Sequence, residues 1–534
     1  MDGKDPDRPT NDDGRPPRPP VPPVFAVPET ALRRFGATVL DPRTATRVGD
    51  EPAPRAVAYV PHRLFVPGLT DEQLDEGPLQ LLRRIGEEMD FQVDVLPSRV
   101  AAAAQELGYA ERLGRSTHRL VELRPNPGRV GAPLTAWDVV QRARGVDRKA
   151  AAGFSLNHVM MSSGLEGVGY MGGVGYMGGV GYMGGVGYMG GVGYMGGVGY
   201  MGGVGYMGGV GAPGVAAGRG PVQLHVDAPQ PTGGPSPVVA VLDTGLGSHP
   251  WFDGSPLVDR DPTVAGQTIG LRFAPDRDPE GRGVTVDTVN GTLDALAGHG
   301  TFVAGVIRQQ CPDARLVVVP VMYGDGAADE QDVVEALGLL ALYHWAAQEG
   351  RVDHEPLSVV NLSMGYYHER PDTVSDEDAL FRVIATLAED GVAVVAAAGN
   401  GSTTEHFWPA ALSQNPNRTI PVAAVGALNP TGKAAATFSN TGEWVTHWHP
   451  GVAVVSTMPT TLEGSLRGDL AVPARDGSPA RETPDPDCYA TGFGVWSGTS
   501  FAAPCCAGGI SQLLATKACG SVAEAVAKAL GGAP

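Results

Sequence analysis

The stretch Val238-Val239-Ala240-Val241-Leu242-Asp243-Thr244-Gly245 decides the fold class, because five apolar residues lead without a break into a polar turn. Similar short apolar runs follow at residues 316–321, 357–362, 392–398, 420–425 and 452–455. Amphipathic helical patterns lie between several of them, most clearly at 330–348 and 376–389. Wholly apolar strands that alternate with helices predict an α/β fold, in which helices cover both faces of a mostly parallel sheet.

Polar residues stand where these predicted strands end. Asp243 follows the first run, and Asn400 follows the run at 392–398. The run at 357–362 leads into Ser363, Met364 and Gly365. Ligands of parallel sheets bind at the carboxyl ends of the strands, so we expect these residues to lie near one site.

Two further polar residues stand at predicted helix starts. His299 lies between Gly298 and Gly300, and Ser500 opens an apolar segment that runs to about residue 518. The free N–H groups and partial positive charge of a helix N-terminus favour an oxyanion. The sequence also predicts that Gly498 allows a tight turn into this helix and that Pro504 lies near its first turn, where a missing N–H costs little.

Each of these residues has a structural explanation when taken alone. Asp243 could cap a turn, His299 could be a hydrogen-bonded core residue, and Asn400 could supply a left-handed turn. Together with Ser500 they fit the requirements of nucleophilic catalysis by a serine. A serine hydroxyl needs a base to accept its proton, a histidine can be that base near neutral pH, and an aspartate can orient the imidazole.

Four motifs carry these residues in the order Asp243, His299, Asn400 and Ser500. They are D-T-G, G-H-G-T-x-V-A-G, A-A-G-N and G-T-S-x-A-A-P, and residues 236–518 resemble the subtilisin-like serine peptidases through them. The resemblance implies a subtilisin-like three-layer fold and a serine endopeptidase that acts through an acyl-enzyme intermediate. Asp243, His299 and Ser500 would be its catalytic triad. The Asn400 side chain and the Ser500 backbone N–H would hold the oxyanion.

The resemblance also implies where a polypeptide substrate binds. An extended substrate would lie against the main chain of Ser363, Met364 and Gly365. The wall of the pocket for the side chain before the scissile bond would include Ala396, Ala397 and Ala398.

The chain divides into four predicted parts. Residues 1–24 form a disordered Pro-rich leader, 25–161 an α+β domain, 162–234 a Gly-rich linker and 235–534 the peptidase domain. The α+β domain has the predicted element order β-α-β-β-α-β, a ferredoxin-like plan. By resemblance it is a prodomain, and a permanent regulatory module is the alternative. Both would act in cis on the active site.

The linker contains the hexapeptide Gly-Val-Gly-Tyr-Met-Gly seven times, from residue 167 to 208. Glycine at half of the positions makes a packed core costly in entropy. A flexible linker is favoured over a self-association segment. Two charged inserts, at about 254–294 and 458–492, are interpreted as solvated surface loops rather than lids or substrate-recognition loops.

Composition limits partners and cofactors. The net charge of -19 argues against nucleic acid and anionic membranes. Since neither a signal peptide nor a membrane span is recognised, we expect a cytoplasmic protein. No metal site is assigned. Calcium is implied by the resemblance only, and His447 with His449 is a weak candidate for a metal site.

A second function is compatible with the sequence. The chain could be a catalytically silent or self-processing-only interaction or regulatory protein built on the same fold. The intact set of Asp243, His299, Asn400 and Ser500 favours an active endopeptidase.

Overall fold

The computed structural model describes residues 27–75, 77–114, 117–128, 133–162, 219–370, 377–414, 422–468 and 470–529. The predicted leader at 1–24 and the repeats at 167–208 lie outside the described residues. Every helix in the described ranges is too short or too polar to cross a lipid bilayer.

A seven-stranded sheet forms the centre of the larger part of the chain, and all of its strand pairs are parallel. The predicted mixed α/β fold with a parallel central sheet is therefore confirmed. In spatial order the strands are β18 (His447–Pro450), β17 (Ala423–Leu428), β15 (Ala393–Ala397), β13 (Leu357–Leu362), β7 (Val238–Asp243), β11 (Arg315–Pro320) and β8 (Val258–Asp259).

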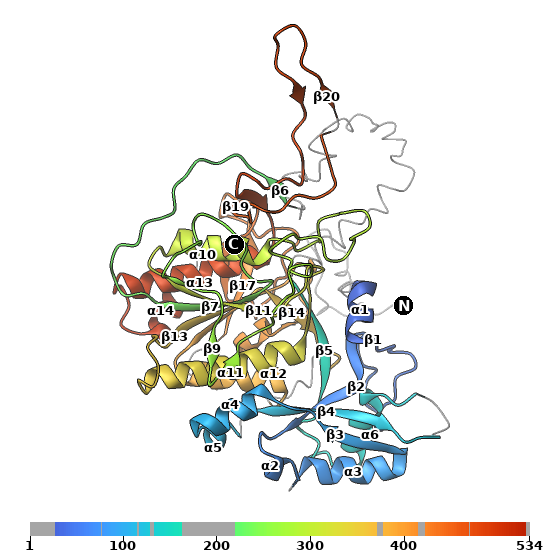
Figure 1. Ribbon diagram of the computed structural model, residues 1–534. Helices are drawn as coiled ribbons and strands as arrows, with labels where there is room; N and C mark the ends of the chain where they lie inside the picture. Colours follow the sequence, from blue (N-terminus) through green and yellow to red (C-terminus); the bar gives the residue numbers. More distant parts are fainter. Residues whose placement is uncertain are drawn as a thin grey trace, which may run out of the picture.

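Helices cover both faces of this sheet (Figure 1). Successive side chains of a strand point to opposite faces, so Ala240 and Leu242 join one apolar core while Val239 and Val241 join the other. The helices of the first core are α11 (Glu330–Gln348) and α12 (Ala379–Glu389), and those of the second are α10 (His299–Gln310), α13 (Thr499–Ala515) and α14 (Val522–Lys528).

One apolar run was assigned to the wrong sheet. Residues 452–455 do not enter the parallel sheet. Instead β19 (Val454–Thr457) pairs antiparallel with β22 (Phe493–Trp496), which also pairs with β6 (Gly220–Pro221). The polar strand β18 takes the edge of the parallel sheet, where the Nε2 atoms of His447 and His449 lie 3.1 and 2.8 Å from carbonyl oxygens of Val526 and Ala529. Apolar patterning cannot reveal a strand whose polar side chains are paired in this way.

The N-terminal part has the predicted β-α-β-β-α-β order. Its strands pair antiparallel in the spatial order β5-β2-β4-β3. The elements are β2 (Ala58–Pro67), α3 (Pro78–Met89), β3 (Phe91–Val95), β4 (His118–Pro125), α6 (Ala136–Val146) and β5 (Ser155–Ser162). Smaller elements are α1 (Glu29–Phe35), β1 (Thr38–Val39), α2 (Asp71–Asp75), α4 (Arg99–Leu107) and α5 (Ala110–Leu113). Strand β2 runs through Pro61 without interruption, and the register of its pairing with β5 shifts between Tyr59 and Leu64.

Strand β5 joins the two parts of the molecule. One end of β5 pairs with β2 of its own domain. The other end lies between β12 (Ala327–Asp329) and β14 (Met364–Tyr367) of the larger domain, and β14 also pairs with β16 (Phe407–Trp408). An eight-stranded sheet thus runs through both domains, and Figure 1 shows β5 rising from the lower domain beside β14.

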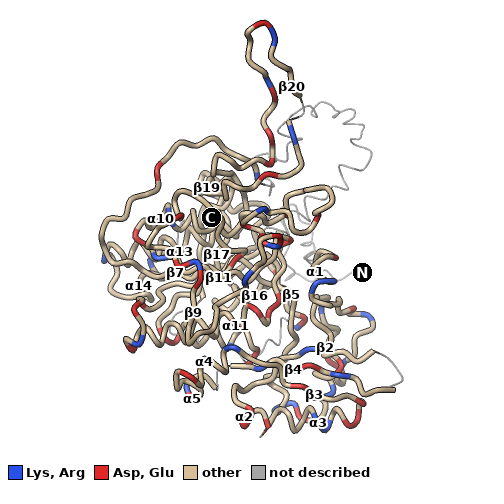
Figure 2. Tube along the Cα trace, viewed as in Figure 1, with Lys and Arg blue, Asp and Glu red and all other residues tan. Residues whose placement is uncertain are grey.

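The two inserts differ in character. The second one carries a hairpin, β20 (Ala471–Val472) with β21 (Arg481–Glu482), that projects from the body with charges of both signs (Figure 2). The first one contains β9 (Thr263–Val264) and β10 (Gln267–Thr268), but it also buries Glu280 and Asp294. The interpretation as surface loops is therefore wrong for part of the first insert.

Candidate active site

Asp243 and His299 form a buried hydrogen-bonded pair. Asp243 is the last residue of β7, and its Oδ1 lies 2.7 Å from His299 Nδ1. Because a carboxylate oxygen accepts, Nδ1 carries a proton, and in the neutral imidazole the lone pair is then on Nε2. The Nε2 atom is buried and has no hydrogen-bond partner among the described residues. The pair therefore presents a base at Nε2.

The glycines beside His299 are required by space. Gly298 has φ +81°, and a Cβ there would lie 2.6 Å from Met458 Cε. A Cβ at Gly300 would lie 2.2 Å from the carbonyl oxygen of Gly245, in the turn after Asp243. Real Cβ atoms do not approach a carbonyl oxygen this closely, so Gly300 lets α10 begin directly against the turn after β7, while Gly298 supplies the left-handed backbone before the helix.

Glu280 is a buried residue of this site that the sequence analysis missed. Its Oε1 accepts from the Thr244 hydroxyl and from Gly300 N–H at 2.9 Å, while Oε2 accepts from the Thr301 hydroxyl at 2.5 Å. Glu280 thus links the turn after Asp243 to the start of α10. No regular spacing marked it, because it lies in a charged insert whose other carboxyl groups, apart from that of Asp294, are partly or fully exposed.

Burial raises the pKa of Glu280 to about 7, against the lowering effect of hydrogen bonds from Thr244 and Thr301. The folded protein therefore holds this proton at pH values where the unfolded chain has lost it. Stability should fall as the pH rises from about 4.5 to about 7 and then level off, with a total cost on the order of 3 kcal/mol.

We expect Glu280→Gln, which resembles the neutral carboxyl group, to remove this cost. In a Ser500→Ala background, urea unfolding at pH 5 should give similar free energies with and without Glu280→Gln. At pH 8 the glutamine variant should be the more stable by up to about 3 kcal/mol. The exposed Glu482→Gln serves as the control and should show no such difference. Equal effects of Glu280→Gln at the two pH values would contradict the prediction.

Ser500 is the second residue of α13 and is fully buried. Its Oγ donates to the Ser363 carbonyl oxygen at 3.4 Å, and no hydrogen bond joins it to His299 within the described residues. Trp496 and Phe501 pack around the His299 ring, with ring centroids 5.4 and 5.2 Å away. The structure thus joins Asp243 to His299 and leaves the Ser500 hydroxyl on Ser363. Serine–base hydrogen bonds are often long or absent before substrate binds.

The start of α13 differs from expectation in two details. Gly498 has φ 160°, which is extended backbone, and a Cβ there would lie 3.3 Å from Asn400 Nδ2. Glycine therefore leaves room for this amide rather than permitting a tight turn. Pro504 is the sixth residue of the helix, beyond the first turn, and cannot donate to the Ser500 carbonyl oxygen. The Ser363 hydroxyl donates to that oxygen instead, at 3.0 Å.

Asn400 is held by the residue before Ser500. Its Oδ1 accepts from the backbone N–H and from the hydroxyl of Thr499, both at 2.9 Å. A backbone N–H can only donate, so the amide oxygen must face Thr499. This orientation directs the NH₂ group of Asn400 away from Thr499, toward the side on which Gly498 lacks a side chain.

The predicted substrate strand is already paired in this structure. In the antiparallel register of β14 and β5, Met364 lies opposite Ser162 and Gly365 opposite Met161. Gly365 is also confined on its other side, where a Cβ would lie 2.2 Å from the Trp408 carbonyl oxygen.

The three predicted pocket alanines are fully buried near the end of β15. Ala396 and Ala398 belong to the core under α11 and α12, whereas Ala397 belongs to the opposite core. The Ala398 carbonyl oxygen accepts from Asn440 Nδ2 at 2.8 Å. The side chains of Ala396 and Ala398 therefore share one face, and Ala397 points to the other.

The chain belongs to the subtilase family, whose family model matches residues 234–530. Subtilisin DY of Bacillus licheniformis is 30% identical over 197 residues, which cover 34% of this chain and 62% of that protein. Serine protease AprX of Bacillus subtilis is 26% identical over 287 residues, 51% of this chain and 55% of AprX. Subtilisin E of the same organism is 30% identical over 250 residues, 45% of this chain and 54% of the relative. The chain thus spans little more than half the length of the curated relatives it matches.

Proposed function

We propose that the protein is a serine endopeptidase with Ser500 as nucleophile, His299 as general base and Asp243 as the residue that orients it. The observation that carries the proposal is the 2.7 Å contact between Asp243 Oδ1 and His299 Nδ1, which leaves a buried basic nitrogen with no partner among the described residues. Membership of the subtilase family and the relatives named as serine proteases support it.

In the proposed reaction, Ser500 Oγ leaves the Ser363 carbonyl oxygen and attacks the scissile carbonyl carbon while His299 Nε2 takes its proton. The imidazolium that forms is stabilised by Asp243. The negative charge on the substrate oxygen faces the NH₂ group of Asn400 and the Ser500 N–H at the start of α13. Collapse of this intermediate breaks the peptide bond, and His299 returns the proton to the leaving amine. Water then attacks the acyl-enzyme by the same route.

A fluorophosphonate probe tests the proposal directly, because it reacts covalently with an activated serine. We expect the probe to label the wild-type chain on Ser500 and to leave Ser500→Ala unlabelled, with the labelled peptide identified by mass spectrometry. In this structure β5 covers the predicted substrate strand and can block the site until the chain processes itself. The probe should therefore be applied to protein as purified and again after prolonged incubation. Absence of label on Ser500 under both conditions would favour the silent alternative.

Asn400 is proposed to stabilise the oxyanion through its NH₂ group. We expect Asn400→Ala to lower kcat by about 10²–10³-fold with little change in KM, a magnitude known for the equivalent loss in subtilisin. Thr499→Ser keeps the hydroxyl and backbone donors that orient Asn400, so it should keep most of kcat. A drop in kcat as large for Thr499→Ser as for Asn400→Ala would contradict this role. Steady-state hydrolysis of a chromogenic peptide measures both.

The N-terminal domain is proposed to act in cis by occupying the substrate strand. Support comes from the pairing of Met161 and Ser162 with β14. Several ion pairs also hold the domains together: Arg34 contacts Asp325 at 2.8 Å beside the end of β5, and Arg99 contacts Glu335 at 2.7 Å away from β5. In this state a polypeptide substrate could not pair with Met364 and Gly365.

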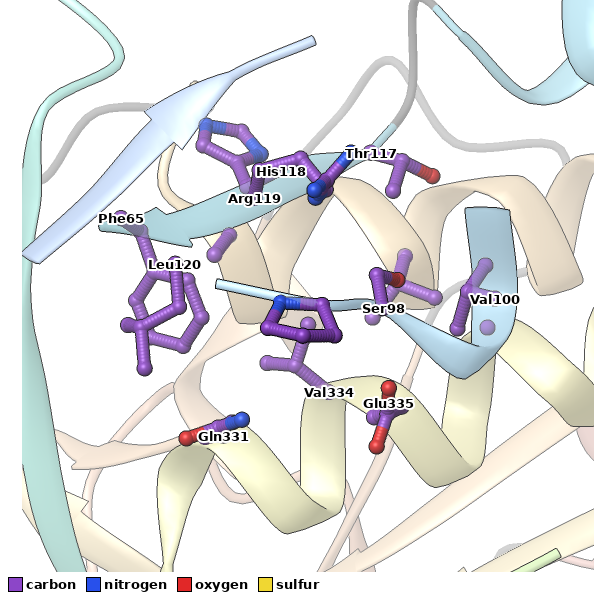
Figure 3. Close-up of a pocket in the computed structure, with 14 residues that line it drawn as sticks. Phe65, Ser98, Val100, Thr117, His118, Arg119, Leu120, Gln331, Val334 and Glu335 are labelled. Carbon is purple, nitrogen blue, oxygen red and sulfur yellow. The ribbon is translucent and has the colours of Figure 1, made fainter. Parts of the chain in front are cut away.

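The N-terminal sheet packs closely against helices α11 and α12, but the interface is not completely filled. A cavity of about 30 Å³ remains there, lined by Phe65, Val100, Leu120 and Val334 among others (Figure 3). Glu335, which pairs with Arg99, lies at its edge in the same view. A cavity of this size has room for only a few water molecules, so the interface resembles a packed core rather than a binding pocket.

Calcium, implied by the family resemblance, has no role in the proposed mechanism. Calcium takes six to eight oxygen ligands. The one group of three His, Cys or acidic side chains close enough to share an ion among the described residues contains two histidines, a donor set that does not suit calcium.

A further inference from the structure

We propose that a zinc ion, or a divalent transition-metal ion of the same ligand preference, binds between the two domains on His158, His368 and Glu369. The three residues are fully buried, and their candidate ligand atoms lie within 4.8 Å of one another. His158 belongs to β5 of the N-terminal domain, whereas His368 and Glu369 directly follow β14 of the peptidase domain. The proposal does not depend on the chemistry of Ser500.

The distances suit a metal with tetrahedral coordination. Glu369 Oε2 lies 2.9 Å from His158 Nε2 and 3.4 Å from His368 Nδ1. Ligand atoms about 2.0–2.1 Å from a tetrahedral zinc ion stand about 3.3 Å apart. Two imidazoles and one carboxylate are the protein ligands of many zinc sites with one open position, and they do not suit Mg²⁺ or Ca²⁺.

Both histidines have the outer partner that metal-bound imidazoles usually have. His158 Nδ1 lies 2.7 Å from Glu330 Oε2, and His368 Nε2 lies 3.1 Å from Asp378 Oδ2. In each ring one nitrogen therefore faces a carboxylate while the other faces Glu369. A carboxylate that accepts the outer N–H fixes the tautomer and leaves the inner nitrogen free to bind metal.

The contacts of His368 agree with this tautomer. Its Nδ1 accepts the backbone N–H of Arg370 at 2.9 Å, so this nitrogen carries a lone pair, and Nε2 carries the proton that faces Asp378. Metal binding would replace the Arg370 contact, which is a local one two residues along the chain. On His158, Glu330 Oε2 also accepts the backbone N–H at 2.8 Å and so holds the whole residue in place.

The charges around the group favour a dication. Three buried carboxyl groups meet here, on Glu330, Glu369 and Asp378. Arg144 is the guanidinium whose charge acts on both Glu369 and Asp378. Buried charges must be paired, and a divalent ion with two neutral imidazoles would balance three carboxylates against one arginine. The alternative to a metal ion is a second proton on His158, which would be shared between Glu330 and Glu369. That proton adds only one positive charge, so the group would keep a net charge of −1.

The position of the group gives the ion a structural consequence. His158 lies four residues before Ser162, about 13 Å along an extended strand, and Ser162 pairs with Met364. An ion bound here would fasten β5 to the peptidase domain next to the part of β5 that covers the substrate strand. Removal of the ion would loosen β5 without changing any residue of the triad.

Zinc binding by the full-length Ser500→Ala protein tests the proposal without proteolysis. Protein produced with ZnCl₂ and then desalted should retain one zinc per chain by elemental mass spectrometry. His158→Gln, His368→Gln and Glu369→Gln should each lose it. Glu330→Gln, which keeps the ligands but weakens the support of His158, should bind zinc about 10–100-fold more weakly. The matched control is His118→Gln, a buried histidine of the same domain whose Nε2 faces the Gly153 carbonyl oxygen; it should retain zinc.

A second measurement covers variants that fold poorly. Cobalt(II) bound to Ser500→Ala should give the intense visible bands of tetrahedral coordination, and His368→Gln, whose change lies outside β5, should not. Zinc should raise the Tm of Ser500→Ala and of His118→Gln but not that of His368→Gln. If Ser500→Ala retains no zinc, or if His158→Gln and His368→Gln retain as much as His118→Gln does, the proposal is wrong and a shared proton occupies the group.

Discussion

Ser500→Ala is expected to lower kcat by about 10⁶-fold, the scale on which loss of this nucleophile acts in subtilisin. The alanine removes the only atom proposed to form a covalent bond to the substrate, while the Asp243–His299 pair and Asn400 stay in place. Peptide hydrolysis and fluorophosphonate labelling measure the loss. The intact mass of the purified chain adds a second readout: Ser500→Ala should stay at full length, whereas the wild-type chain should be cut between β5 and β6.

The matched control is Ser511→Ala. Ser511 is a buried serine of the same helix whose hydroxyl donates to the Ala507 carbonyl oxygen at 2.9 Å, and it lies outside the site. Its replacement should leave kcat near the wild-type value. Substantial hydrolysis by Ser500→Ala, removed by a serine-directed inhibitor, would assign the nucleophile to another serine. A wild-type chain that stays at full length indefinitely would contradict self-processing alone.

Asp243→Asn is expected to lower kcat by roughly 10⁴-fold, the scale on which loss of the corresponding aspartate acts in subtilisin. Asp243 Oδ1 accepts from Thr244 N–H at 2.8 Å as well as facing His299 Nδ1, and Oδ2 has no partner among the described residues. An asparagine oxygen in the Oδ1 position would keep both contacts and the tautomer of His299. The expected loss therefore comes from the missing negative charge, which can no longer stabilise the imidazolium.

This interpretation makes a distinguishing prediction. If charge is the cause, Asp243→Ala should be no more active than Asp243→Asn, and both should lower kcat far more than KM. Asp313→Asn serves as the control, because Asp313 is a buried aspartate that accepts hydrogen bonds from Thr232 and Gly233 rather than from the triad. Wild-type kcat in Asp243→Asn would contradict the role of Asp243.

The central sheet could be predicted because buried parallel strands are apolar on both faces. Asp243 ends β7, Ser363 follows β13 and Asn400 comes shortly after β15, and because these strands are neighbours in the sheet, the strand-end rule placed the three residues together. The glycine after His299 also has a simple physical reason, because the close approach of Gly300 to Gly245 requires a residue without a Cβ.

Other features depend on contacts that no local pattern encodes. Glu280 contributes through three donors from Thr244, Gly300 and Thr301, which lie at most 36 residues away but on different elements. The group of His158, His368 and Glu369 forms only when β5 reaches across to a segment more than 200 residues later. Strand pairing between domains leaves no periodic signal in either partner.

The position of β5 between β12 and β14 has a consequence for what the enzyme can cut. When β5 leaves, two strands are left with unpaired N–H and C=O groups that face a gap one strand wide. Only a chain in extended form can fill such a gap and satisfy both edges at once. A helix or a tightly folded loop cannot. Under the proposed function, local unfolding of a target protein would therefore decide whether it is cleaved before the identity of any side chain does.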